Sequence, residues 1–446
     1  MRLNLIRNAQ KSIYLETFIY DNDPVSRTFT RELMKKARAG LDVRVMIDHL
    51  AGRIDKFFIQ QMQNSGIKVK IYNTKPILSL KKVQYRNHRK LMTVDRQVAL
   101  MGGRNLSNEY YDLDPEYNFI DRDIFIRGPI VSGIEKSFLL YWNDKYASNP
   151  KKPTPPEIED TKYQRMFFRN DERTVIRSLN RDIKRFNKKV NKYKQLFESD
   201  DEDNKIVHDA LAIYKDNLLP NLLNEGGICP SVTFVSDKPG VGKKHQKNQR
   251  ILKHEVFKRM RNAKHEVYIE NPYIVLEKET NELFEDLTEN DTKVTIITNS
   301  FYATDSLLVA SNFNHKAKAF IEESNIDTYL YSGADPLEYA KTDFTDKARW
   351  GIHSKTFIFD NDSFLIGSYN FDPRSNDFNM ELGLFCDGNH YLTSKIKDSI
   401  DLRIKNSYYL KDKQTFEKLK FKKISLGKKI LSYIVTIPAL IFNDLL

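Results

Sequence analysis

Short runs of β-branched and aromatic residues alternate with helical stretches along most of the chain, and this alternation occurs twice. Residues 7–16 read RNAQKSIYLE and residues 261–270 read RNAKHEVYIE, each running from a helical stretch into a strand. The following helix and strand are expected at 31–39 and 43–48 in the first half, and at 279–289 and 294–298 in the second. Strands that alternate with helical patterns are typical of parallel α/β sheets. The pattern predicts two similar α/β domains.

The chain of 446 residues is too long for one ordinary core, so two domains are the default expectation. Between the halves lie a Pro-rich stretch without strand character, a charged helical stretch at 171–197, an acidic run at 200–203 and a helix at 206–219. We expect the charged run to be a solvated face. The predicted units are a first catalytic half (1–148), a linker with a helical insertion (149–249), a second catalytic half (250–410) and a C-terminal tail (411–446).

Charge and cysteine content narrow the class of protein. The formal charge is +12, and the segment 403–429 holds ten basic residues against two acidic ones, a net +8, which leaves the rest close to neutral. This favours anionic partners such as phospholipid surfaces, nucleic acid or phosphorylated substrates. The two cysteines, Cys229 and Cys386, stand far apart, so we expect neither a disulfide framework nor a cysteine metal site, and a reducing compartment is favoured.

Two features bear on membrane attachment. The first ten residues contain no apolar core of a signal peptide. The longest apolar stretch, 430–442, is interrupted by polar residues and by Pro438, and it is shorter than the roughly 18–20 residues that span a bilayer.

The strongest signal is a block of residues that occurs in both halves. Residues 88–105 read HRKLMTVDRQVALMGGRN and residues 353–370 read HSKTFIFDNDSFLIGSYN. Aligned without gaps, both give H-x-K-x4-D-x6-G-[GS]-x-N. The paired positions are His88 with His353, Lys90 with Lys355, Asp95 with Asp360, Gly103 with Ser368, and Asn105 with Asn370. A single His-x-Lys would be read as two exposed residues at a strand end, whereas two complete blocks indicate a function.

Elementary geometry explains the composition of the block. On a strand, residues i and i+2 project from the same face, so each His and its Lys point the same way. A second strand leads into a turn where we expect the backbone N–H groups of Gly103 and Ser368 to approach an anion. The side-chain amides of Asn105 and Asn370 add donors. Two such half-sites facing each other would surround a phosphodiester.

The duplicated block resembles that of the phospholipase D superfamily, and the repeat covers most of residues 1–145 and 250–410. Further segments are most similar to bacterial cardiolipin synthases of the C type: GGRNLSNEYYD (102–112), DRDIFIRGPIV (121–131), TNSFYATDS (298–306) and NFDPRSNDFNMELGLF (370–385). The resemblance implies two phospholipase D-like α/β domains related by pseudo-twofold symmetry, with a helical insertion between them.

The resemblance also implies a mechanism. One imidazole attacks phosphorus and forms a covalent phosphohistidine, while the other protonates the departing alkoxide and then deprotonates the incoming alcohol or water. By analogy with the superfamily, His88 is the nucleophile and His353 the general acid and base. Lys90, Lys355 and the two asparagines stabilise the non-bridging oxygens. No metal or other cofactor is implied, because the two lysines supply the positive charge.

Each imidazole also needs an acceptor at its far nitrogen. In the family this acceptor is an acid downstream of the block, for which Asp123 and Glu381 are the natural candidates. The block residues Asp95 and Asp360 complete the catalytic motif, and we expect them to be structural.

Three functions remain in competition. The leading one is a phosphatidyltransferase that makes cardiolipin from phospholipids such as phosphatidylglycerol, with phospholipase D hydrolysis as a related reaction and the site complete within one chain. The runner-up is a metal-independent nuclease, which we do not expect because the charge lies in one tail. The third is a non-catalytic membrane or trafficking scaffold, which would be expected to have lost a His or Lys.

The expected location follows from the leading function. We expect peripheral attachment to a bacterial cell membrane, with the basic and apolar tail at 416–446 in contact with anionic lipid. Cardiolipin synthases usually carry N-terminal membrane-associating sequence, whereas here the first repeat begins almost at Met1. The chain is therefore either truncated or attached through other surfaces.

Overall fold

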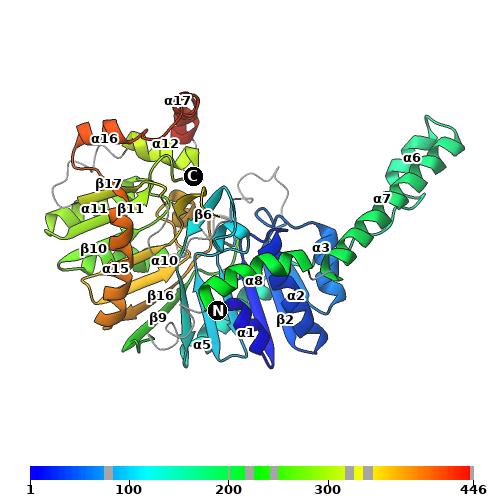
Figure 1. Ribbon diagram of the computed structural model, residues 1–446, viewed down its shortest axis with the longest axis horizontal. Helices are drawn as coiled ribbons and strands as arrows, with labels where there is room; N and C mark the ends of the chain where they lie inside the picture. Colours follow the sequence, from blue (N-terminus) through cyan, green and yellow to red (C-terminus); the bar gives the residue numbers. More distant parts are fainter. Residues whose placement is uncertain are drawn as a thin grey trace.

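The computed structural model describes residues 1–74, 84–198, 201–215, 226–241, 250–316, 326–334 and 345–441. In this part of the chain each half is built on one large mixed sheet (Figure 1). The first sheet has the order β7-β5-β4-β1-β2-β3-β8 and the second β17-β12-β11-β10-β14-β15-β16-β9. The inner order β5-β4-β1-β2-β3 recurs as β15-β14-β10-β11-β12, so the fold repeats as the sequence does. The predicted architecture, two similar α/β domains with a helical insertion between them, is confirmed.

The elements have the following bounds. The first sheet contains β1 (Ser12–Thr17), β2 (Asp42–Asp48), β3 (Lys68–Tyr72), β4 (Leu91–Val94), β5 (Val98–Gly102), β7 (Asp123–Arg127) and β8 (Ala147–Ser148). The second contains β9 (Ser231–Ser236), β10 (Glu266–Glu270), β11 (Lys293–Asn299), β12 (Ile326–Tyr331), β14 (Thr356–Phe359), β15 (Ser363–Gly367), β16 (Leu382–Asp387) and β17 (Ser407–Tyr409). The helices of the two halves are α1 (Arg2–Asn8), α2 (Pro24–Arg38), α3 (Lys56–Asn64), η1 (Asn108–Tyr110), α5 (Ile130–Trp142), α10 (Ile251–Asn262), α11 (Lys278–Glu289), α12 (Leu307–Lys316), α14 (Pro373–Asp377) and α15 (His390–Lys405).

The predicted strands and helices of both repeats are present. β2 and β11 pair in parallel with β1 and β10, and β1 is buried along its whole length, as expected for a sheet covered on both faces. The helix expected at 31–39 begins earlier, because Pro24 occupies its first turn and the Asp23 carboxylate accepts from the backbone N–H of Ser26.

The two halves share a core and a pair of strands. Tyr14 and Met46 of the first half belong to the same buried cluster as Met380 and Leu382 of the second. β6 (Tyr117–Ile120) pairs in parallel with β13 (Arg349–Ile352), which joins the halves by backbone hydrogen bonds. One half therefore helps to hold the other in place.

The second half begins before the predicted boundary at 250. β9 pairs antiparallel with β16 along its whole length and forms the edge of the second sheet. It covers a strand edge that would otherwise carry unpaired backbone groups. The expectation that 149–249 is only linker and insertion was wrong for these residues.

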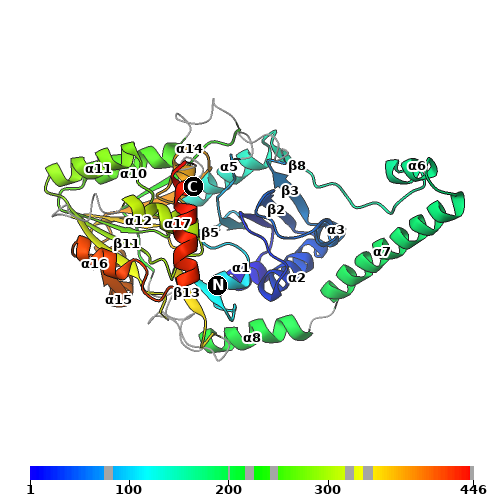
Figure 2. The same ribbon diagram turned by 90° about the horizontal axis from the view of Figure 1, so that it is seen from above.

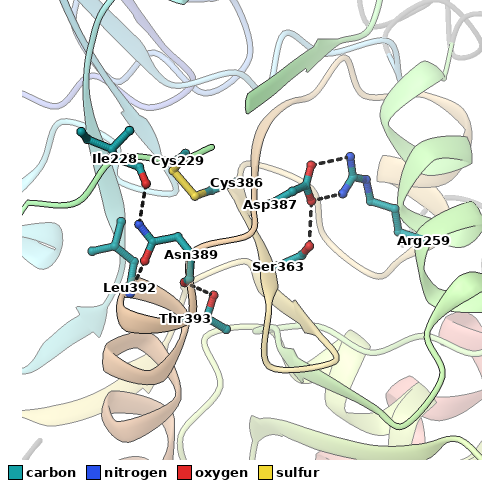
Figure 3. The surroundings of a disulfide bond; sticks show 9 residues. All are labelled: Ile228, Cys229, Arg259, Ser363, Cys386, Asp387, Asn389, Leu392 and Thr393. Carbon is teal, nitrogen blue, oxygen red and sulfur yellow. Dashed lines mark hydrogen bonds and ion pairs between the residues drawn. A yellow bond between two sulfur atoms is a disulfide. The ribbon is translucent and has the colours of Figure 1, made fainter. Parts of the chain in front are cut away.

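A disulfide corrects the interpretation of the cysteines. Cys229 precedes β9, Cys386 lies in β16, and their sulfur atoms are bonded with a Cα–Cα distance of 5.4 Å (Figure 3). The bond fastens the chain that enters β9 to the neighbouring strand, and the side chain of Asn389, the residue before α15, donates to the Ile228 carbonyl. The two cysteines are 157 residues apart, so spacing alone gave no sign of the bond.

The helical insertion forms an arm that projects from the first half (Figures 1 and 2). The arm consists of α6 (Thr161–Phe167) and α7 (Glu172–Glu198), whereas α8 (Asp201–Lys215) returns to the body of the molecule and packs on α2. The end of α7 packs on α3 through Tyr193, whose ring lies 6.3 Å from that of Phe57. In the acidic run, Asp203 is buried and pairs with Arg27 and Arg31 of α2, so this residue anchors the insertion and is not part of a solvated face.

The arm also changes the account of the charge. Residues 161–198 contain twelve basic and four acidic residues, a net +8. The basic C-terminal segment therefore does not supply most of the net positive charge. Residues 161–198 carry as much, and the rest of the chain is net acidic.

The C-terminal tail contains α16 (Lys413–Leu419) and α17 (Leu426–Ile441), the latter packed on α12. No helix within the described residues is long and apolar enough to cross a bilayer.

Candidate active site

Each His-x-Lys segment is held in place by the half of the molecule to which it does not belong. Each segment directly precedes a strand, β4 or β14, so it enters the strand rather than lying within it. The backbone N–H of His88 donates to the Met380 carbonyl at 3.1 Å, and that of His353 to the Ile120 carbonyl at 2.7 Å. Both imidazoles are almost fully buried, with 6% and 5% exposure. The structure thus brings together two segments that are 265 residues apart in the sequence.

Each imidazole meets a buried carboxylate at Nδ1. The Nδ1 atom of His88 lies 2.9 Å and 3.0 Å from the two carboxylate oxygens of Glu381. The Nδ1 atom of His353 lies 2.6 Å from Oδ2 of Asp121. A carboxylate at this position fixes the proton on Nδ1 and leaves Nε2 with a lone pair. Both contacts cross between the halves, so neither half contains a complete histidine–acid pair.

The assignment of Asp123 as a histidine-orienting acid was wrong. Its carboxylate pairs with Arg2 at 3.1 Å and Arg104 at 3.5 Å. Asp121, in the turn between β6 and β7, takes the predicted position. Gly103 makes this contact possible, because a Cβ at that residue would lie 2.2 Å from Oδ1 of Asp121.

The Gly-[Gly/Ser] turns have a different role from the predicted phosphate binding. The backbone N–H of Gly103 donates to the Arg122 carbonyl and that of Ser368 to the Leu382 carbonyl, so both donors are used in strand pairing. The Ser368 hydroxyl donates to the Glu381 carboxylate. The turn therefore admits the shorter acid Asp121 in one block and binds the longer acid Glu381 in the other.

Each block lysine contacts the backbone of the histidine two residues before it. Lys90 Nζ donates to the His88 carbonyl at 2.6 Å, and Lys355 Nζ donates to the His353 carbonyl and lies 2.9 Å from its Nδ1. Both are fully buried. Burial lowers the pKa of Lys355 to about 8, although Asp121 opposes the shift, and burial lowers the pKa of Lys90 well below its usual range.

The same environment keeps both imidazoles neutral. Burial lowers the pKa of His88 well below its usual range, and Lys90 and Lys355 add to this effect. The pKa of His353 is lowered in the same way, with His88 among the contributing groups. Burial raises the pKa of Glu381 to about 7, although Lys90 opposes the shift, and burial also raises the pKa of Asp121. A neutral imidazole is the form that can attack phosphorus.

The two asparagines differ from each other. The Asn105 carbonyl accepts from the backbone N–H of Ile19 at 3.0 Å, and a hydrogen bond from its amide moderates the raised pKa of Tyr110, whose main cause is burial. Asn370 is buried, and its carbonyl oxygen has no hydrogen-bond partner among the described residues. Contact with a phosphate stays a prediction for both.

The block aspartates lie away from the histidines. The Asp95 carboxylate accepts from the backbone N–H groups of Gln10, Lys11 and Ser12, and Asp360 accepts from those of residues 264–266. Each clamps the entry to β1 or β10, the first strand of its repeat. This geometry supports the structural role that we expected, not their place in the catalytic motif.

Sequence reasoning missed a pair of residues at equivalent positions in the two halves. Tyr110, five residues after Asn105, places its hydroxyl 3.4 Å from Nε2 of His353. Ser375, five residues after Asn370, donates from its hydroxyl to Glu381 at 2.8 Å. The signal was available, because both residues lie within the segments that follow the blocks.

The arrangement suits covalent transfer of a phosphoryl-containing group. Two neutral imidazoles with oriented Nε2 atoms can act in turn as nucleophile and as acid–base, and the buried lysines can stabilise charge on phosphorus-bound oxygens. Among the described residues there is no cluster of three or more His, Cys, Asp or Glu that could hold a metal ion.

Comparison with known proteins connects this geometry to a family. Cardiolipin synthase C of Escherichia coli (strain K12) is 24% identical over 425 residues, which cover 92% of this chain and 82% of that protein. An uncharacterized protein of Helicobacter pylori (strain J99) is 26% identical over 433 residues, which cover 92% and 78%. The crystal structure of phosphatidylserine synthase from Haemophilus influenzae Rd KW20 covers 100% of this chain and 92% of its own, with a TM-score of 0.62 and 18% identity, and so shows the same fold.

The family described as "Cardiolipin synthase, PLD-like domain" matches residues 3–142 and 256–402. The two matched ranges are the two halves of the fold, and each contains one complete block with its histidine, its lysine and the acid that serves the opposite histidine. The chain therefore belongs to the cardiolipin synthase and phospholipase D-like domain family.

Proposed function

We propose that the chain is a phosphatidyltransferase that makes cardiolipin from phosphatidylglycerol. Membership of the phospholipase D-like family supports an enzyme of the phosphatidyltransferase kind. The observation that carries the proposal is the pair of buried histidines, each with a carboxylate from the opposite half at Nδ1. The similarity to cardiolipin synthase C of Escherichia coli supports the choice of product.

The proposed reaction has two displacements. Nε2 of His88 attacks the phosphorus of a first phosphatidylglycerol, a P–N bond forms, and the bond from phosphorus to the glycerol oxygen breaks. His353, having taken up a proton, delivers it to the departing glycerol. The hydroxyl of a second phosphatidylglycerol then gives its proton to His353 and attacks phosphorus, which breaks the P–N bond. Water in place of the second lipid would give phosphatidic acid.

Purified protein incubated with phosphatidylglycerol vesicles tests the proposal. We expect cardiolipin with a small share of phosphatidic acid, and glycerol in an amount equal to the sum of the two. The His88→Ala and His353→Ala proteins, checked for an unchanged melting temperature, should form neither. Absence of both lipid products with the wild-type protein would reject the proposal.

The charge of the arm favours one second candidate, a nuclease. The net +8 of residues 161–198 lies outside the C-terminal segment, so the argument that basic residues are confined to one tail no longer holds. Metal-independent cleavage of an oligonucleotide, lost in the His88→Ala protein, would support this candidate.

We propose that the protein acts at the surface of a bacterial membrane, on a side that is oxidising enough for disulfides to persist. The Cys229–Cys386 bond supports such a side, because protein disulfides are rare where thiols are kept reduced. Alkylation of thiols in the host before and after reduction tests this: labelling only after reduction is expected, and labelling beforehand would contradict it.

A further inference from the structure

The C-terminal helix α17 exposes an apolar face that no other described element covers. Leu426, Ile430, Tyr433 and Ile434 are 73%, 53%, 57% and 62% exposed. Their spacing of four, three and one places them on one side of a helix. Exposed large apolar residues gathered on one face mark an interaction surface.

The opposite side of α17 is attached to the protein. Ser432 is 2% exposed, and its carbonyl accepts from the Ser311 hydroxyl of α12. At the border of the exposed face, the ring of Tyr433 lies 5.6 Å from that of Phe421, which in turn lies 5.5 Å from Phe301. The helix is thus fixed in orientation, with its apolar face turned outward.

The charge around this face has a single sign. Lys422, Lys423, Lys428 and Lys429 are all exposed, and residues 421–441 contain no Asp or Glu. A second copy of the chain is a poor occupant, because a symmetric contact between two such helices would bring lysines against lysines. An anionic surface would neutralise them while the apolar side chains enter it.

The helix lies one loop away from the candidate active site. The residues just before the helix contact the loop after β11, because Lys423 Nζ lies 5.5 Å from the ring of Tyr302. The carbonyl of Tyr302 accepts from Arg349, the first residue of β13, which leads directly to His353. A lipid surface held by α17 would therefore be held next to the strand that leads to His353.

We propose that α17 lies flat on an anionic phospholipid bilayer, with Ile430 and Ile434 inserted among the lipids and Lys429 at the phosphate level. Figure 1 shows α17 and the α6 end of the arm on the same side of the molecule, so the arm can reach the same surface. The proposal is independent of turnover, because it concerns where the protein binds and not which bond it breaks.

Sedimentation of the full chain with vesicles tests the proposal, and the His88→Ala background keeps the lipids unchanged during the measurement. We expect binding to vesicles of phosphatidylcholine that contain phosphatidylglycerol, and little binding to pure phosphatidylcholine. Lys429→Gln should weaken binding about fivefold, and Ile430→Ser with Ile434→Ser about tenfold or more. All substituted side chains are exposed, so the melting temperature should not change.

Lys136→Gln with Leu140→Ser is the matched control, because these residues are an exposed Lys and an exposed Leu on one face of α5. This variant should bind like the parent protein. Undiminished binding of both α17 variants would overturn the proposal, as would equal binding to both kinds of vesicle. A stable dimer that the Ile430→Ser and Ile434→Ser variant dissociates, seen by light scattering without any loss of vesicle binding, would also overturn it and assign the face to a second copy.

Discussion

Replacement of Asp121 by Asn is the sharpest test of the site, because Asp123 offers a matched control two residues away. The Asp121 carboxylate lies 2.6 Å from Nδ1 of His353 and is 3% exposed. Asn has nearly the same shape, but its amide donates a proton and favours the wrong tautomer, with the proton on Nε2. A hydrogen bond to a charged group contributes about 1.5–3 kcal/mol, which is about 10- to 150-fold in rate.

We expect Asp121→Asn to lower kcat with phosphatidylglycerol by at least that factor, with little change in KM, because this carboxylate is buried behind the imidazole that it orients. Asp123→Asn should retain kcat within a few-fold and lose stability, since it leaves the nearly buried Arg2 without its partner. Initial rates and thermal melting of both proteins provide the comparison. A folded Asp121→Asn protein with the parent kcat would refute the role of the carboxylate.

Three further outcomes are expected. The plot of kcat/KM against pH should be a narrow bell. Below its pKa of about 7 Glu381 takes up a proton and no longer accepts from His88, and above its pKa of about 8 Lys355 loses its proton. A flat profile from pH 6 to 9, about one unit beyond either pKa, would contradict this. Reduction of the disulfide should lower the free energy of unfolding in guanidinium by about 2–5 kcal/mol, and the reductant should have no effect on a protein with Cys229→Ser and Cys386→Ser. Tyr110→Phe should lower kcat by about 2- to 10-fold through loss of one neutral hydrogen bond to His353, with the fold retained, whereas an unchanged kcat would remove Tyr110 from the site.

Local periodicity explains why much of the fold could be predicted. The strand and helix patterns of both halves are short-range signals, and duplication allowed each half to check the other. The pairing of His88 with His353 followed from the blocks alone. Glu381 was identified as an orienting acid from the family resemblance, and the structure places it against His88.

Contacts between the halves explain what could not be predicted. The Asp121–His353 contact spans 232 residues and the Cys229–Cys386 bond 157, and neither leaves a periodic trace in the sequence. Asp121 and Asp123 lie in one short segment and each packs against a glycine, Gly103 and Gly102, so the sequence alone does not distinguish them. β9 was misassigned to the insertion because the edge strand that it covers, β16, lies far along the chain.

The near symmetry of the site leaves open which histidine attacks, and the surroundings of the two Nε2 atoms differ. Nε2 of His353 has the Tyr110 hydroxyl within 3.4 Å, whereas His88 contacts the Glu381 carboxylate and the backbone of Ser368. A nitrogen that can share a proton with a hydroxyl suits an acid–base. The difference supports His88 as the attacking residue.

A substrate with a good leaving group separates the two roles. With a p-nitrophenyl phosphodiester, departure needs no proton, so a His353→Gln protein should still form the P–N bond at His88 but should not activate the water that breaks it. We expect one equivalent of nitrophenol and an adduct on the peptide that contains His88, found by mass spectrometry under alkaline conditions. The His88→Gln protein should give neither. The reverse pattern, with the adduct at His353 in the His88→Gln protein, would exchange the roles and would show that the Tyr110 contact does not determine which imidazole attacks.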